Sequence, residues 1–144
     1  MKPFLILAII LLSSGSLLAG DRGVTLTVTV TNISGVKSDL LIGIYDSEKA
    51  FTKKPLPYSP KIDLNSEDVV TAEIMGLSPG KYAIVVIQDL NENGKLDKTP
   101  FGLPKEPLAF SVVHEIPKGK PEFEACSFEV GAKDLKMTIA LVVK

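Results

Sequence analysis

The residues with the most distinctive types and spacing lie in one polar loop, residues 89–97. Gly94 at the sixth position of this loop permits a sharp turn, and the backbone carbonyl of Lys95 stands at the seventh. Calcium prefers a mixture of carboxylate, amide and carbonyl oxygens at such spacing. The loop is therefore a candidate Ca²⁺ site. Its side-chain ligands would come from the first, third, fifth and ninth positions, which are Asp89, Asn91, Asn93 and Asp97.

The ligand set of this loop is incomplete when it is compared with an EF-hand. The twelfth position, where an EF-hand carries a bidentate glutamate, is Pro100. Glu106 lies beyond the loop and could fold back to complete the site, as could Glu92. With two carboxylates and two amides, a weak affinity is expected, on the order of 10⁻⁴–10⁻³ M. Asn, Asp and Gly also favour turns without any metal, so a metal-free structural turn remains an alternative.

The chain after this loop, residues 99–111, is long but stiffened by prolines, each of which fixes φ and restricts the residue before it. Long, stiff loops often carry function. Phe101, Lys105 and Glu106 are therefore candidates for a recognition point. The alternative is that the apolar side chains of this segment cover one end of the fold; these are Phe101, Leu103 and Phe110.

Catalytic groups are sparse. The chain holds one His and one Cys, which excludes an internal disulfide framework and a Cys/His zinc cluster. Ser111 is near His114 in sequence, but it does not lie in a nucleophile elbow. Cys126 lies in a strand-like stretch and is expected to be buried and inert. These features favour a non-enzyme, and a hydrolase-like enzyme that uses the loop carboxylates is the alternative.

The composition sets the class of molecule. The chain has 144 residues with 16 basic and 17 acidic side chains, for a net charge of −1. Such a chain fits one domain and has no overall excess of positive charge for binding nucleic acid or anionic lipid. Aromatic residues make up only 6% of it, which provides no stacking platform for single-stranded nucleic acid.

The N-terminus is typical of a secretory signal. One lysine, Lys2, is followed by an apolar run over residues 4–12 and by small residues up to Ala19. We therefore expect a signal peptide over 1–19 and a single mature domain over 20–144. The apolar run is short for a membrane span, which needs ~20 residues, although a short anchor or a buried first strand remains an alternative. No second apolar segment is long enough to span a membrane, so the mature chain is expected in the periplasm or outside the cell.

The residue pattern of the expected mature chain predicts β-strands. Apolar residues and threonines alternate strictly over 24–31, which no helix can satisfy. A strand is expected over 81–88, and residues 82–87 within it are apolar on both faces, which indicates that it is covered on both sides or mostly so. One helical turn is expected over 46–51, capped by Asp46 or Ser47. The pattern predicts an all-β sandwich of seven to eight strands. The remaining strands are expected over 40–45, 61–64, 69–75, 108–113, 122–130 and 135–143.

Distinctive residues lie in four segments, which are 42–46, 77–82, 88–97 and 102–111. Together these segments resemble a bacterial family catalogued as domain of unknown function 2141. The resemblance covers roughly residues 24–143, with departures at Leu90 and Ala109. It implies an exported β-sandwich of the immunoglobulin-like or prealbumin-like kind, and it implies no established reaction.

These observations favour an exported, non-catalytic binding or structural module of the cell envelope. Its expected partner is a protein, a peptide or another envelope component. Ca²⁺ would order the loop over residues 89–97 and would do no chemistry there.

Overall fold

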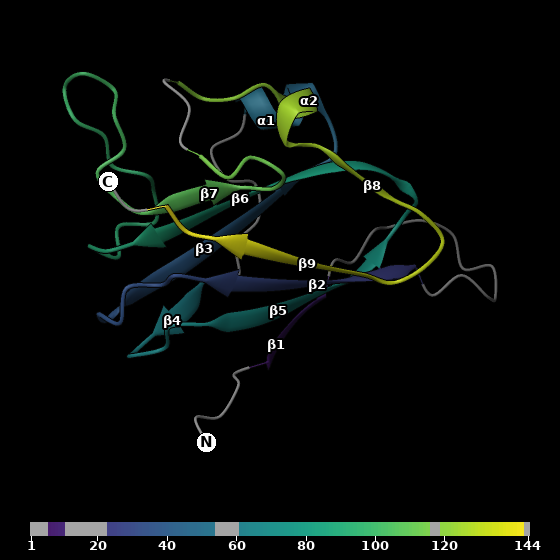
Figure 1. Ribbon diagram of the computed structural model, residues 1–144, viewed down its shortest axis with the longest axis horizontal. Coiled ribbons are helices and arrows are strands. Elements are labelled where there is room, and N and C mark those ends of the chain that lie inside the picture. Colours follow the sequence, from purple (N-terminus) through teal and green to yellow (C-terminus); the bar gives the residue numbers. More distant parts are fainter. Residues whose placement is uncertain (1–5, 11–22, 54–60, 116–118, 143–144) are drawn as a thin grey trace.

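The computed structural model describes residues 6–10, 23–53, 61–115 and 119–142. The first sheet has the strand order β1-β5-β2-β9, and the second has the order β4-β3-β6-β7, with β8 also paired to β6. Figure 1 shows β9, β2 and β5 side by side, with β7 and β6 above them and β3 crossing behind them. The prediction of an all-β sandwich is confirmed. The strands are β1 (Ile6–Ile10), β2 (Val24–Thr31), β3 (Ser38–Tyr45), β4 (Ile62–Leu64), β5 (Val70–Leu77), β6 (Gly80–Asp89), β7 (Leu108–Phe110), β8 (Phe128–Val130) and β9 (Leu135–Ala140).

The central strand of the first sheet is β2. It pairs antiparallel with β5 and parallel with β9. Its four apolar side chains are all buried, whereas its threonines are half-buried, as strict alternation requires. The buried face packs against the second sheet and forms the main hydrophobic core with residues such as Leu40, Ile42, Ile84 and Val86.

The second sheet buries both of its faces. On β6, Ile84 and Val86 point into the main core, whereas Val85 and Ile87 point into a second apolar cluster on the other face. Two short helices supply part of this cluster, α1 (Glu48–Lys53) and α2 (Phe123–Cys126). They lie beside each other in Figure 1. The expectation that 81–88 is covered on both sides is confirmed.

The predicted local structure is right for α1 and wrong in three other places, one of which is the strand expected over 135–143, since β9 ends at Ala140. Ser47 caps α1 by accepting the backbone N–H of Ala50 at 3.4 Å. Residues 122–130 were expected as one strand, but α2 interrupts them because Phe123 and Cys126, three residues apart, both turn into the second cluster. The strand expected over 108–113 ends at Phe110.

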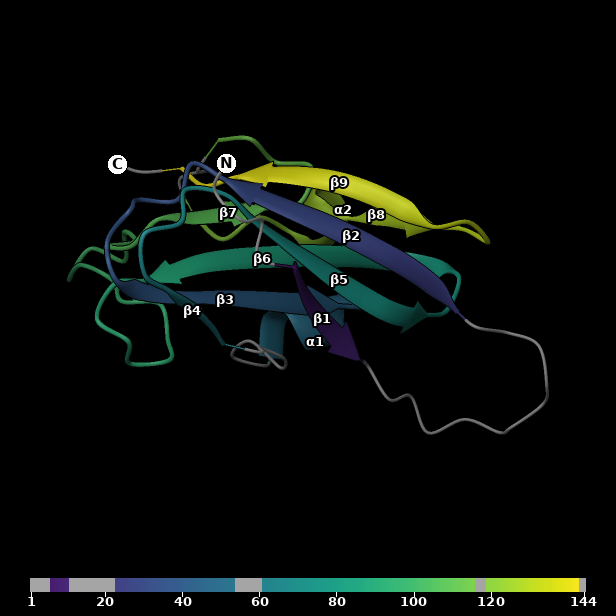
Figure 2. The ribbon, with the colours of Figure 1, turned by 90° about the horizontal axis from the view of Figure 1, so that it is seen from below.

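The N-terminal apolar run contributes a strand to the first sheet. Figure 2 shows β1 next to β5, with which it pairs in parallel from Ile6↔Thr71 to Ile10↔Met75. This placement corresponds to the first-strand alternative of the sequence analysis. The expected cleavage point at Ala19 lies outside the described residues, and cleavage remains a prediction. Of the helices that the structure describes, none is long and apolar enough to cross a membrane.

Candidate functional site

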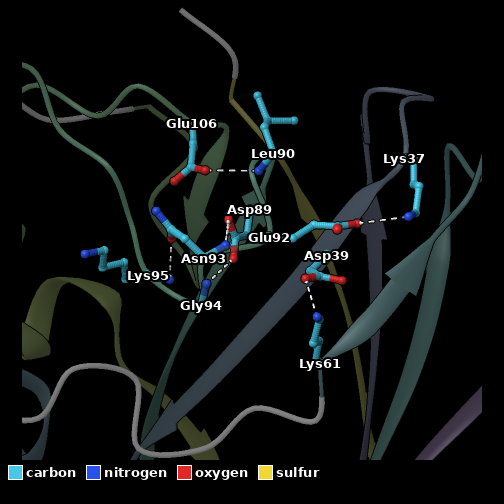
Figure 3. Close-up of polar contacts among 10 residues, drawn as sticks. All are labelled: Lys37, Asp39, Lys61, Asp89, Leu90, Glu92, Asn93, Gly94, Lys95 and Glu106. Carbon is cyan, nitrogen blue, oxygen red and sulfur yellow. Dashed lines mark hydrogen bonds and ion pairs between the residues drawn. The ribbon is translucent and has the colours of Figure 1, made fainter.

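The loop between β6 and β7 is built around two buried carboxylates. The first is Asp89, the last residue of β6, whose side chain is fully buried. Its Oδ1 accepts the backbone N–H of Asn93 at 3.2 Å, and its Oδ2 accepts that of Gly94 at 2.6 Å. Gly94 adopts φ 79°, a left-handed conformation that glycine tolerates well. Asp89 therefore folds the first half of the loop into a tight turn (Figure 3).

The second carboxylate is Glu106, which is also buried. Its Oε1 accepts the backbone N–H of Leu90 at 3.0 Å, and its Oε2 accepts that of Asp97 at 2.9 Å. Burial raises the pKa of Glu106, these two hydrogen bonds oppose the rise, and the charges of Asp89 and Asp97 add to it. Glu106 thus holds both ends of residues 90–97 against the start of β7.

Two of the predicted ligands, Asn91 and Asn93, contact a third, Asp97. The side-chain amide nitrogens of Asn91 and Asn93 lie 2.5 Å and 3.0 Å from Oδ2 of Asp97. Turning the Asn91 amide by half a turn would present its oxygen beside this carboxylate, whereas turning that of Asn93 would break the contact of its oxygen with Lys95. The Asn93 carbonyl oxygen accepts the backbone N–H of Lys95 at 3.0 Å.

The other two predicted side-chain ligands, Asp89 and Glu106, accept hydrogen bonds from the backbone. Both oxygens of Asp89 and both oxygens of Glu106 accept loop N–H groups. Within the described parts of the chain, no three Asp, Glu, His or Cys side chains come together as a metal site. The buried carboxylates of Asp89 and Glu106 therefore support the loop that carries Asn91, Asn93 and Asp97.

The tip of the loop is an exposed, hydrogen-bonded turn. The backbone N–H of Gly102 donates to the carbonyl of Thr99 at 2.9 Å, and that of Thr99 donates to the carbonyl of Leu103 at 2.8 Å. The side chain of Phe101 is 90% exposed and that of Leu103 is 42% exposed. The alternative that these two residues cover the end of the fold is therefore wrong, and it holds only for Phe110, which is buried in the second cluster. Of the three recognition candidates, Phe101 and Lys105 are exposed and Glu106 is buried.

One buried acid in this region belongs to no sequence motif. Asp39 lies on β3 between its register partners Asp63 on β4 and Asp89 on β6, so the three side chains share one face of the sheet. Its carboxylate is buried, and Oδ2 forms an ion pair with Lys61 at 2.8 Å. Figure 3 shows this pair below Asp89. A single acid at the start of an apolar strand has no motif that could have identified it.

The remaining chemical groups have structural roles. The Ser111 hydroxyl is buried, donates to the carbonyl of Cys126 at 2.6 Å and accepts the backbone N–H of Ile84 at 2.8 Å. His114 is exposed on the surface. Cys126 is buried, as expected, and burial raises the pKa of its thiol to about 11, which leaves it unreactive.

Comparison with known proteins gives one match. Searches of curated proteins and of solved structures find no match. A family model described as an uncharacterised protein conserved in bacteria matches residues 28–138, well over half of the 144-residue chain. The match spans the strands from β2 to β9 and the whole loop between β6 and β7. The chain therefore belongs to the bacterial family of domain of unknown function 2141.

Proposed function

We propose that this protein is an exported, non-catalytic binding or structural module of the cell envelope, and that the loop between β6 and β7 is its recognition element. The observation that carries the proposal is the construction of this loop. Two buried carboxylates, Asp89 and Glu106, each fix two backbone N–H groups, while Phe101 at the tip is 90% exposed. A rigid loop with an exposed aromatic loses little conformational entropy when it binds a partner.

The same contacts support a non-catalytic role. A general acid or base must present a free oxygen or proton to a substrate. The oxygens of Asp89 and Glu106 instead accept backbone N–H groups inside the loop. The matched family is described as uncharacterised, so it assigns no reaction to the chain.

Calcium binding is the second part of the proposal. Asn91, Asn93 and Asp97 would hold the ion, with the backbone carbonyl of Lys95 in the seventh position of the loop. A bound ion would replace the two amide contacts that Asp97 now receives and would order the loop. The affinity expected for so few carboxylates is on the order of 10⁻⁴–10⁻³ M.

Isothermal titration and thermal unfolding with Ca²⁺ test this site. Asp97→Asn removes one charge while its backbone N–H still donates to Glu106, so the loop stays closed. Asp134→Asn, in the exposed turn before β9, is the matched control. We expect millimolar Ca²⁺ to stabilise the wild type and the control but not Asp97→Asn. Equal responses of the three proteins would refute the site, and Mg²⁺ tests its selectivity.

Export is tested separately. A fusion of residues 1–30 to a reporter that is active only outside the cytoplasm should be exported and processed near Ala19. A charged residue placed in the apolar run, Leu7→Lys, should block processing. Retention of the unprocessed fusion in the cytoplasm would refute the proposed location.

A further inference from the structure

The tip of the loop exposes apolar surface that cannot fold back onto the protein. Phe101 and Leu103 stand on a turn closed by backbone hydrogen bonds, and the hydroxyl of Thr99 also accepts the backbone N–H of Leu103 at 3.1 Å. Pro100 fixes the backbone directly before Phe101. Lys98 and Pro104 form a bridge at the base of the tip. The ring of Phe101 therefore stays in solvent because the backbone holds it there.

The charges at this tip are all positive. Residues 98–105 include two exposed lysines, Lys98 and Lys105, and no acidic residue. Lys98 pairs with Pro104 in the bridge and Lys105 is one residue further along, so the two lysines leave opposite faces of the hairpin. In the part of the chain that the structure describes, neither lysine forms an ion pair with a carboxylate.

The acids closest in sequence lie outside residues 98–105 and are engaged in contacts elsewhere. Asp89 and Glu106 are buried, and the Asp97 side chain receives two amide donors. Exposed Glu92 forms an ion pair with Lys37 at 3.8 Å (Figure 3). A net charge of −1 for the whole chain therefore coexists with a locally basic tip.

The shape of the tip decides between classes of partner. A stable protein–protein interface buries about 800 Å² on each partner and needs close shape complementarity. The tip projects from the sandwich as part of a rounded loop (Figure 1) and offers two exposed apolar side chains. A lipid surface requires no matching shape, because it deforms around an inserted side chain, and its phosphates attract lysines.

We propose that residues 98–105 dock on the surface of an anionic phospholipid bilayer, with Phe101 and Leu103 entering the boundary between headgroups and acyl chains and with Lys98 and Lys105 facing the phosphates. The inference names the partner of the loop and rests on the proposed role of that loop in binding. It does not require a bound calcium ion.

The test uses a tryptophan as a local probe, because the natural chain has none. Phe101→Trp places it at the tip, and Val36→Trp places it at another exposed apolar position, 53% exposed, as the matched control. Each protein, in the form that an exporting host releases, is mixed with vesicles of phosphatidylglycerol and phosphatidylethanolamine, or with phosphatidylcholine vesicles, in EDTA. The tryptophan emission reports insertion of the tip alone, so membrane binding by the N-terminal segment would not produce the signal.

We expect the emission of Phe101→Trp to shift to shorter wavelengths with anionic vesicles and to stay constant with phosphatidylcholine, and that of Val36→Trp to stay constant with both. Adding Lys98→Gln and Lys105→Gln should weaken the apparent affinity for the anionic vesicles by roughly 30-fold. The same substitutions at two exposed lysines elsewhere, Lys133→Gln and Lys136→Gln, should leave it unchanged.

Three results would overturn the proposal. They are no spectral shift of Phe101→Trp at millimolar anionic lipid, an equal shift with phosphatidylcholine, and an equal shift of Val36→Trp. If the emission of Phe101→Trp does not shift with lipid but Phe101→Ala abolishes binding to an acidic protein, the loop is a protein-recognition element instead. Because EDTA is present, failure of the calcium site leaves this result unaffected.

Discussion

The carboxylate of Glu106 accepts the backbone N–H of Asp97 at 2.9 Å, across nine residues of chain. Its other oxygen accepts the N–H of Leu90 at 3.0 Å. One side chain therefore sets the positions of both ends of the segment that carries the proposed calcium ligands. The position of Asp97 depends on a residue that lies outside the calcium-like motif.

Removal of this carboxylate should open the loop. In Glu106→Ala, the N–H groups of Leu90 and Asp97 lose their acceptors, and we expect the free energy of unfolding to fall by about 1–3 kcal/mol. Urea unfolding measures the change, and amide hydrogen exchange at the two residues should become faster. Glu115→Ala, an exposed glutamate, is the control and should change little. Unchanged exchange at Leu90 and Asp97 would contradict the role of Glu106.

The raised pKa of Glu106 predicts a pH dependence of stability. Because burial raises this pKa, the folded chain holds the proton more tightly than the unfolded chain does. The resulting stabilisation is fully present below the unfolded pKa of about 4.3, and it is lost as the pH rises through the folded pKa. We therefore expect the wild type to lose stability relative to Glu106→Gln over that interval.

Urea unfolding of both proteins from about pH 4 to pH 7 measures this difference. Glu106→Gln is suitable because its side chain is neutral throughout and similar in shape to the protonated acid. Parallel pH profiles for the two proteins would show that Glu106 has an unperturbed pKa.

Two phenylalanines should differ sharply in their importance for stability. Phe51 is fully buried, and its ring packs edge-on against Tyr45 at 5.2 Å and against Phe123 at 6.0 Å between centroids. Phe51→Ala should cost about 3–5 kcal/mol through the cavity that it creates. Phe101→Ala, at an exposed position, should stay within about 0.5 kcal/mol of the wild type. Chemical denaturation compares them, and a large loss for Phe101→Ala would mean that the tip packs against the fold.

Val112 should be a site of backbone strain. It adopts φ 69°, which is unfavourable for a β-branched side chain, and it is 53% exposed, so little packing compensates. Val112→Gly should relieve about 1–3 kcal/mol of strain and cost about 0.5–1 kcal/mol in the entropy of the unfolded chain. We expect a net stabilisation of about 1 kcal/mol in thermal unfolding. Val36→Gly, with the same exposure but no positive φ, should destabilise. A loss of stability in both variants would argue against strain.

The sequence was most informative where burial repeats regularly. Strict alternation identified β2, and an unbroken apolar run identified β6 together with the cover on both of its faces. The strand expected over residues 122–130 was wrong, because Phe123 and Cys126 are both buried by the second cluster and the backbone forms a helical turn there. Tertiary contacts, which no local pattern contains, decided that segment.

For the candidate site, the spacing of oxygen atoms correctly brought Asn91, Asn93 and Asp97 together. It could not show that the carboxylates of Asp89 and Glu106 bind backbone N–H groups, because a ligand and a loop anchor use the same residue types. The sequence also left the exposure of Phe101 open. An aromatic side chain in a proline-rich loop can either pack over the end of the fold or stand exposed in solvent. The burial of Asp39 depends on its two neighbouring strands, which are distant in sequence.

The parallel pairing of β2 with β9 has a consequence for synthesis. Leu26 of β2 is in register with Leu135 of β9, and the side-chain amide of Asn32 donates to the carbonyl of Leu141 at 2.5 Å. β2 therefore lacks its parallel neighbour until residues 135–140 have been synthesised. Completion of the first sheet depends on this late segment, and a nascent chain interrupted before residue 135 lacks the β9 side of β2.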